Sequence, residues 1–167
     1  MGKPRIIITC GDINGIGPEV TVKALMDTDV LSRIAPILVG PAAVFRGVAE
    51  PLSAPFTIVE RYGEPERPDE IPCLLPENCS VPETKPGQTT PEAGALAVKC
   101  IVHAAETVMR GDADALVTAP INKAAIHRAG YDYAGHTELL ADLTGTADYR
   151  MMLVAGNATK YWWPRAK

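Results

Sequence analysis

The chain has 167 residues, 47% hydrophobic and 22% charged, values that are ordinary for one globular domain. The 16 Lys and Arg against 20 Asp and Glu give a formal net charge of -4, so no basic field exists to attract nucleic acid or acidic lipid. No run of about eighteen apolar residues is present, and the first residues lead directly into a predicted strand. We therefore expect a cytoplasmic protein with no membrane segment and no nucleic-acid partner.

The first predicted unit is a strand, a loop and a helix. Residues 6–8 are isoleucines typical of a buried strand, residues 11–17 contain three glycines that predict a tight turn, and Pro18 is typical of a first helical turn. The helix N-terminus would attract an anion, although the carboxylate of Asp12 would repel a phosphate. The loop matches neither the dinucleotide fingerprint, whose last glycine is replaced by Val20, nor a P-loop.

Strands and helices then alternate along the chain. This pattern predicts an α/β fold with a mostly parallel sheet, flanking helices and right-handed crossovers. The proline-rich residues 62–91 are predicted to form a long surface excursion that contains one strand. The predicted strands are 37–40, 56–59 and 71–75, and the predicted helices are 20–26, 42–48 and about 92–110.

The long helix near residues 92–110 has two candidate starts. Two histidines, on this helix and on the next one, also need an interpretation. Thr89 with Glu92 fits a capping box, whereas Thr90 fits an N-cap followed by proline at the first helical position. His103 lies beside the apolar stripe, and His127 lies on the next short helix. We interpret both histidines as structural.

The four cysteines are Cys10, Cys73, Cys79 and Cys100. They show no Cys-x-x-Cys spacing, and no histidine lies at zinc-finger distance. Because cytosolic disulfides are rare, we predict reduced thiols. A labile bridge between Cys73 and Cys79 is the alternative.

Residues 115–130 form a second predicted strand, loop and helix, in which Pro120 is expected to start the helix and Gly130 to end it. This places Asn122 and Lys123 at the carboxyl end of a strand, the edge at which open α/β sheets bind ligands. The alternative is that Lys123 is a solvated helix lysine.

His136 and Thr137 follow Gly135 at the start of a further predicted helix. An imidazole exchanges protons near neutral pH and a hydroxyl donates or accepts hydrogen bonds, so the pair is suited to a hydroxylated substrate. Alternatively, Thr137 caps the helix, which Gly145 would end.

Three motifs together resemble the 4-hydroxythreonine-4-phosphate dehydrogenase family, and the resemblance covers roughly residues 4–156. They are Gly-Asp-Ile-Asn-Gly-Ile-Gly-Pro-Glu at 11–19, Val-Thr-Ala-Pro-Ile-Asn-Lys at 117–123 and Gly-His-Thr-Glu-Leu-Leu at 135–140. The family oxidises a secondary alcohol on a phosphorylated four-carbon acid with NAD or NADP, and the product then loses carbon dioxide. A divalent metal (zinc, magnesium or cobalt) polarises the reacting oxygen, and the pathway is pyridoxal phosphate (vitamin B6) synthesis.

By this resemblance, His136 and Thr137 bind the substrate, and Asp12, Asn14 and Lys123 line the cleft. The same motifs suit a threonate or erythronate 4-phosphate dehydrogenase. A third hypothesis is a non-catalytic binding or dimerisation module that pairs with an intact subunit.

The resemblance also implies a homodimer of two-lobed subunits of the isocitrate and isopropylmalate dehydrogenase type, here incomplete. Residues 1–130 would form most of the first lobe, residues 131–156 would begin the second, and residues 157–167 form an atypical tail with both tryptophans. The family's metal histidines follow the stretch that corresponds to residues 151–154, and no histidine follows it here. We therefore expect no metal ligands and no bound NAD(P) or metal, as in an inactive, truncated N-terminal fragment whose tail arose by frameshift. The alternative is a natural short form whose tail is an aromatic anchor.

Overall fold

The computed structural model describes residues 2–61, 63, 65–155 and 159–163, with side chains up to residue 150. The chain divides into two compact units, Met1–Asp132 and Tyr133–Lys167, and each is described by itself.

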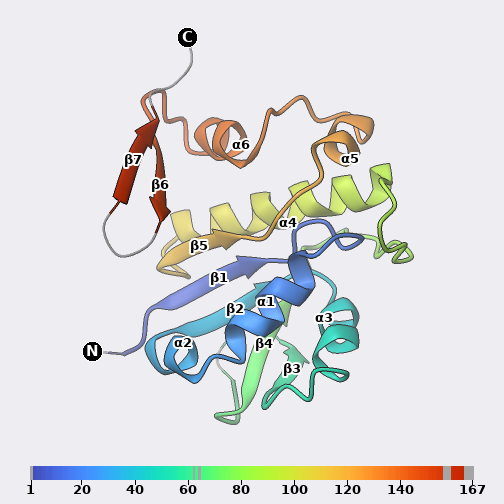
Figure 1. Cartoon of the computed structure of the whole chain (residues 1–167), viewed down its shortest axis with the longest axis vertical. Helices are drawn as coiled ribbons and strands as arrows, with labels where there is room; N and C mark the ends of the chain where they lie inside the picture. Colours follow the sequence, from blue (N-terminus) through green and yellow to red (C-terminus); the bar gives the residue numbers. More distant parts are fainter. Residues whose placement is uncertain (1, 62, 64, 156–158, 164–167) are drawn as a thin grey trace. The chain divides into compact units, whose positions relative to one another are not determined.

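The first unit is built on a five-stranded sheet in the order β3-β4-β2-β1-β5 (Figure 1). All of its strand pairs are parallel. The mostly parallel α/β sheet predicted from the alternating pattern is therefore confirmed. The strands are β1 (Arg5–Thr9), β2 (Ala35–Val39), β3 (Thr57–Glu60), β4 (Glu70–Leu74) and β5 (Ala115–Thr118).

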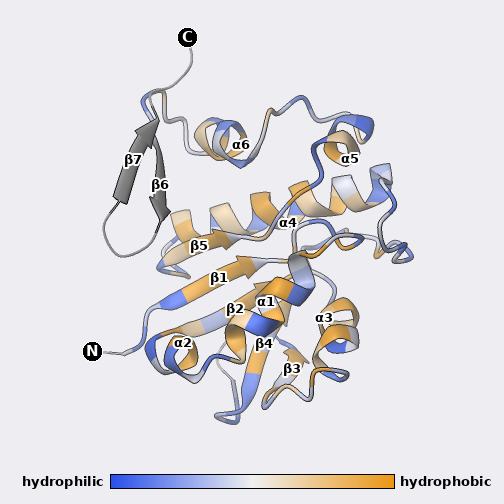
Figure 2. Cartoon of the chain, viewed as in Figure 1, coloured by the Kyte–Doolittle hydropathy of each residue, from blue (hydrophilic) through white to orange (hydrophobic). Residues whose placement is uncertain are grey.

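Helices flank this sheet, and their contacts define the layers. Helices α1 and α3 pack against each other in front of the sheet in Figure 1, whereas α4 packs on β1 and β5 and also against α5. Hydrophobic residues gather on the central strands and along α4 (Figure 2), and they build one core with fully buried members such as Ile7, Leu38 and Phe45. The helices are α1 (Gly17–Leu25), α2 (Thr28–Arg33), α3 (Ala42–Ala49), α4 (Pro91–Met109) and α5 (Lys123–Arg128).

Two helix starts differ in detail from the sequence patterns. Pro120 does not start α5: Asn122 is the N-cap, and its side chain accepts a hydrogen bond from the Ala125 N–H. An asparagine side chain satisfies an exposed N–H group, which proline cannot do. At α4, the second alternative is correct, because Thr90 caps the helix and Pro91 is its first residue.

Helix α2 was not predicted from the sequence. It begins after Asp27, whose side chain accepts from the Asp29 N–H, and none of its residues is buried. A helix without a buried stripe has no apolar periodicity that a sequence pattern would show.

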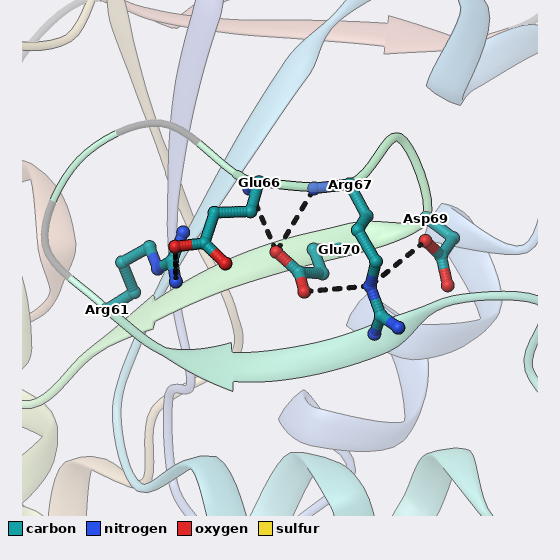
Figure 3. Close-up of polar contacts among 5 residues, drawn as sticks. All are labelled: Arg61, Glu66, Arg67, Asp69 and Glu70. Carbon is teal, nitrogen blue, oxygen red and sulfur yellow. Dashed lines mark hydrogen bonds and ion pairs between the residues drawn. The ribbon is translucent and has the colours of Figure 1, made fainter.

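The connection between β3 and β4 is fixed by charged side chains (Figure 3). Glu70 accepts from the N–H groups of Glu66 and Arg67 at 2.9 and 3.3 Å, and from the Arg67 Nε at 3.0 Å. Burial alone raises the pKa of Glu70, but these hydrogen bonds and the Arg67 charge outweigh it and hold the pKa below its ordinary value. An exposed ion pair between Arg61 and Glu66, at 2.6 Å, joins the same connection.

The second unit contains α6 (His136–Leu143) and an antiparallel hairpin of β6 (Met151–Ala155) and β7 (Thr159–Trp163). The hairpin pairs Met151 with Trp163 and Ala155 with Thr159. Residues 159–163 of the predicted atypical tail therefore form a strand, while residues 157, 158 and 164–167 lie outside the described residues.

Candidate functional site

The order of the strands singles out the carboxyl ends of β1 and β5. From β1 the chain proceeds to β2 on one side, and only after α4 does it return to place β5 on the other side. This is the topological switch point of the sheet, the place at which open α/β sheets bind ligands. The loops in question are residues 10–16 after β1 and residues 119–122 after β5.

The two loops touch through backbone atoms. The Asp12 N–H donates to the Pro120 carbonyl at 2.9 Å, and Gly11 adopts a φ of +65°. A Cβ on Gly11 would lie 2.3 Å from the Pro120 oxygen, so a larger residue would force the loops apart. The glycine that the sequence pattern assigned to a tight turn is therefore required by this close approach.

Asn14 ties the loop after β1 to the segment that precedes α4, here called the strap (residues 85–90). Its Nδ2 donates to the Gln88 carbonyl and to the Thr90 Oγ, both at 3.1 Å. Its Oδ1 accepts from the Lys85 N–H at 2.7 Å, and its carbonyl accepts from the Gly87 N–H at 2.7 Å. Asn14 is only 4% exposed, so its amide is fully used inside the protein. These contacts make Asn14 a positioning residue of the loop.

A second asparagine holds the strap from the other loop. Besides capping α5, Asn122 donates from Nδ2 to the Thr89 Oγ at 3.0 Å. Arg128, near the end of α5, donates to the Thr89 carbonyl at 3.0 Å. Both loops at the switch point are thus fastened to the same strap.

Asp12 is the acidic group at this edge and is 6% exposed. Its Oδ1 accepts from the Asn14 N–H at 2.9 Å, which shapes the turn. Among the described residues no cation forms an ion pair with this carboxylate. Its other oxygen is therefore suited to accept a hydrogen bond from a ligand that binds at this edge.

Lys123 is exposed and is the first residue of α5. A cation at this end of a helix is disfavoured by the helix dipole, so the position does not serve helix stability. The exposure agrees with a solvated lysine, and the place beside Asn122 at the carboxyl end of β5 agrees with a ligand-binding lysine. Both interpretations of Lys123 stay open at this point.

His136 and Thr137 belong to the second unit and are the first two residues of α6. The N-cap of α6 is Gly135 and no side chain caps the helix, so the alternative that Thr137 is the cap is wrong. Tyr133 donates to the Asp142 Oδ2 at 2.7 Å, and this bond raises the pKa of the Tyr133 hydroxyl.

The structure brings Asp12 and Asn14 together with the loop that leads to Lys123, all in the first unit.

The other two histidines lie elsewhere. His103 lines a hollow of about 600 Å³ together with Arg5 and Glu70, which begin β1 and β4, so it lies at the amino ends of the strands. Burial, reinforced by the charge of Arg110, lowers the pKa of His103. His127 is exposed in the last turn of α5.

All four cysteines are free thiols, as predicted, and the alternative bridge between Cys73 and Cys79 is absent from this structure. The Cys10 and Cys100 sulfur atoms lie 3.9 Å apart in the core. Burial raises the pKa of the Cys73 thiol to about 12, so this group stays protonated and inert. Within the described residues, no three His, Cys, Asp or Glu side chains are grouped so as to hold a metal ion.

Residues 32–160 match the family described as pyridoxal phosphate biosynthetic protein PdxA. The chain belongs to this family. It is 40% identical over 157 residues to the D-threonate 4-phosphate dehydrogenase of Salmonella typhimurium, a match that covers 92% of this chain and 48% of that protein. The 4-hydroxythreonine-4-phosphate dehydrogenase of Desulfosudis oleivorans is 40% identical over 159 residues, which cover 93% of this chain and 46% of that one.

Solved structures that are similar to this chain belong to the same family. A crystal structure of a 4-hydroxythreonine-4-phosphate dehydrogenase from Burkholderia phymatum superposes with a TM-score of 0.83 at 34% identity, over 93% of this chain and 48% of that one. The enzyme of the same name from Klebsiella pneumoniae gives 0.78 at 36% identity, over 92% and 47%. The chain therefore spans about half the length of the relatives it matches, and it belongs to a family of dehydrogenases, as the three motifs predicted.

The strap is the part of the site that sequence reasoning missed. Residues 85–90 lie in the stretch interpreted as a surface excursion, and most of them are exposed. The Pro86-Gly87 pair predicts a turn, but nothing in the sequence connects the strap to Asn14, which lies 71 to 76 positions from its partners there, or to Asn122, which lies 33 positions from Thr89. In the described part of the chain, no helix is long and apolar enough to cross a membrane.

Proposed function

We propose that this chain carries the substrate-binding side of a cytoplasmic NAD(P)- and metal-dependent dehydrogenase that acts on a phosphorylated four-carbon hydroxy acid. The observation that carries the proposal is the family match over residues 32–160. It is supported by the switch point of the sheet, where the loops after β1 and β5 meet.

Two substrates fit this proposal, because the relatives are named for both of them. One is 4-hydroxythreonine 4-phosphate. The other is D-threonate 4-phosphate, which the sequence motifs indicated, together with erythronate 4-phosphate, as an alternative substrate. The two acids share the phosphate and the secondary alcohol, so the same groups would bind both. The family description favours the first, as a step in pyridoxal phosphate synthesis.

The residues of this chain have distinct proposed roles. His136 and Thr137 bind the hydroxylated part of the substrate, because an imidazole and a hydroxyl both donate and accept hydrogen bonds. Lys123 binds a carboxylate or phosphate oxygen as a point charge. Asp12 accepts a hydrogen bond from the substrate, and Asn14 holds the loop of Asp12 in place through the strap.

The dehydrogenase reaction needs NAD or NADP to accept a hydride and a divalent metal to stabilise the alkoxide. The described residues do not fit the metal, because no group of three ligand side chains occurs among them. No reaction step is therefore assigned to a metal on this chain. We propose that the chain alone is inactive, and that a complete site belongs to a homodimer of longer subunits.

Binding of the two acids to the chain tests the substrate side of this proposal. Titration calorimetry should show that Lys123→Gln and His136→Ala each weaken binding about tenfold, the equivalent of about 1.4 kcal/mol for a lost polar contact. Lys99→Gln is the matched control, because Lys99 is also exposed but lies on α4. Equal affinity of the wild type and both site variants would refute the proposed roles. Co-purification with an intact subunit, without binding of either acid, would favour the dimerisation module.

A further inference from the structure

Two asparagines of the switch-point loops use their side-chain amides in the same way. Each accepts a backbone N–H bond at Oδ1 and donates from Nδ2 to a threonine hydroxyl of the strap. Asn14, in the loop after β1, donates to the Thr90 Oγ at 3.1 Å, and Asn122, in the loop after β5, donates to the Thr89 Oγ at 3.0 Å. The two threonines are neighbours in the chain, so adjacent hydroxyls hold the two loops.

The Thr89-Thr90 pair is itself anchored to two helices. A planar peptide unit joins the two residues, so a shift of one displaces the other. The Thr90 Oγ accepts from the Ala93 N–H at 3.4 Å and the Thr90 carbonyl from the Gly94 N–H at 3.2 Å, which anchors the pair to α4. Arg128 of α5 donates to the Thr89 carbonyl at 3.0 Å. A displacement of the pair towards one loop therefore disturbs its bond to the other.

We propose that these two threonines are positioning residues that couple the loop of Asp12 to the loop of Lys123. Asp12 is reached through Asn14, whose N–H donates to the Asp12 Oδ1 at 2.9 Å, and Lys123 directly follows Asn122 in the chain. The coupling holds both loops in one arrangement before the phosphorylated acid binds, which reduces the cost of ordering them on binding. The identity of this ligand rests on the proposed function, whereas the coupling of the loops does not.

Thr89 is the residue at which coupling can be told apart from a local effect. Its hydrogen bonds go to Asn122 and Arg128 and not to the loop after β1. Thr89→Val keeps the shape of the side chain but leaves the Asn122 Nδ2 without its acceptor. If the strap couples the loops, this change reaches the loop after β1 through Thr90. If each loop is held independently, its effect stays at Asn122.

Amide hydrogen exchange of the chain without ligand tests the coupling directly. The N–H groups of Asn14 and Gly15 close the turn after β1, and both should exchange at least about tenfold faster in Thr89→Val. Thr89→Ser keeps the hydroxyl and should exchange as the wild type does. Thr84→Val is the matched control, because Thr84 is exposed and lies just outside the strap. Unchanged exchange at Asn14 and Gly15 in Thr89→Val, or equal acceleration in Thr84→Val, would overturn the inference.

Binding of the two phosphorylated acids gives a second readout. Titration calorimetry should show that Thr89→Val weakens binding about tenfold while its melting temperature stays within about 4 °C of the wild type, and that Thr89→Ser restores the affinity. A change in stability without a change in affinity would make Thr89 a structural residue only and would overturn the inference. If the wild type binds neither acid, the proposed function fails instead, and the exchange rates alone decide the coupling. Arg128→Met, which removes the bond to the Thr89 carbonyl, replaces Thr89→Val in both measurements if that variant does not fold.

Discussion

Asn14 and Thr90 are 76 positions apart in the chain, yet the Asn14 Nδ2 donates to the Thr90 Oγ at 3.1 Å. The same hydroxyl also caps α4 by accepting from the Ala93 N–H at 3.4 Å. The loop after β1 and the start of the longest helix are therefore fixed by one side chain. Burying a polar side chain such as that of Asn14, which is only 4% exposed, costs free energy unless its hydrogen bonds are made. Here its amide oxygen and nitrogen both have partners.

Replacing Asn14 by alanine should lower the free energy of unfolding by about 2–4 kcal/mol, because the Lys85 N–H, the Gln88 carbonyl and the Thr90 hydroxyl all lose their partner at part-buried positions. Urea unfolding at neutral pH measures this difference. Gln88→Ala is the matched control, since Gln88 is exposed and bonds to Asn14 only through its backbone. A cost of less than about 0.5 kcal/mol for Asn14→Ala would contradict the role assigned to this residue.

Two glycine-to-alanine changes in helices should have opposite effects. A Cβ on Gly94 in α4 would lie 2.3 Å from the backbone of Ala125 in α5, so Gly94→Ala should lower stability by about 1–3 kcal/mol despite the better helix propensity of alanine. At Gly47 in α3 nothing lies within 4 Å, so Gly47→Ala should raise stability by up to about 1 kcal/mol. Thermal unfolding of both variants decides the matter. A rise in stability in Gly94→Ala would show that α4 and α5 do not pack as described.

Thr9 and Thr107 should respond differently to replacement by valine. Among the described residues, Thr9 Oγ is the buried side-chain atom without a hydrogen-bond partner, so Thr9→Val should raise the free energy of unfolding by about 1 kcal/mol. Thr107 donates to the His103 carbonyl at 2.7 Å, so Thr107→Val should lower it by a similar amount. Chemical denaturation measures both, and a loss of stability in Thr9→Val would imply a partner for its hydroxyl.

Stability should fall in acid because two carboxylates are more acidic in the folded chain. The side-chain and backbone hydrogen bonds from Arg5 lower the pKa of Asp114 below its ordinary 3.8, and those from Glu66 and Arg67 lower the pKa of Glu70 below 4.5. A lowered folded pKa contributes stability that is present above the unfolded pKa and lost as pH falls through the folded value. The denaturation midpoint should thus be constant above about pH 5 and fall steadily below about pH 4.5. Asp114→Asn should flatten that fall, and an unchanged acid limb in this variant would exclude the contribution of Asp114.

Much of the fold could be predicted because its residues follow local rules. The isoleucines of β1, the apolar run of β5 and the Thr90-Pro91 start of α4 each carry a pattern that their own neighbours complete. The parallel sheet then follows from the alternation of strands and helices. The proposed cleft residues Asp12 and Lys123 come from the family motifs rather than from periodicity.

The rest depends on contacts between distant residues. The strap shows no periodicity, and its order comes from two asparagines that belong to other loops. Helix α2 has no buried face, and the start of α5 was assigned to Pro120 because a capping asparagine two residues later is a weaker signal than a proline. The Ile58 carbonyl of β3 likewise receives its hydrogen bond from Arg46, 12 residues away.

We propose that this chain carries the substrate side of the dehydrogenase site but not the complete machinery. The most direct measurement supplies the purified chain with NAD or NADP, either phosphorylated acid, and zinc, magnesium or cobalt in turn, and follows reduction of the nicotinamide by its absorbance. The account predicts no reduction above the blank, while the full-length Salmonella typhimurium enzyme turns over its substrate in the same assay. Metal-dependent reduction by this chain that disappears in His136→Ala would contradict it.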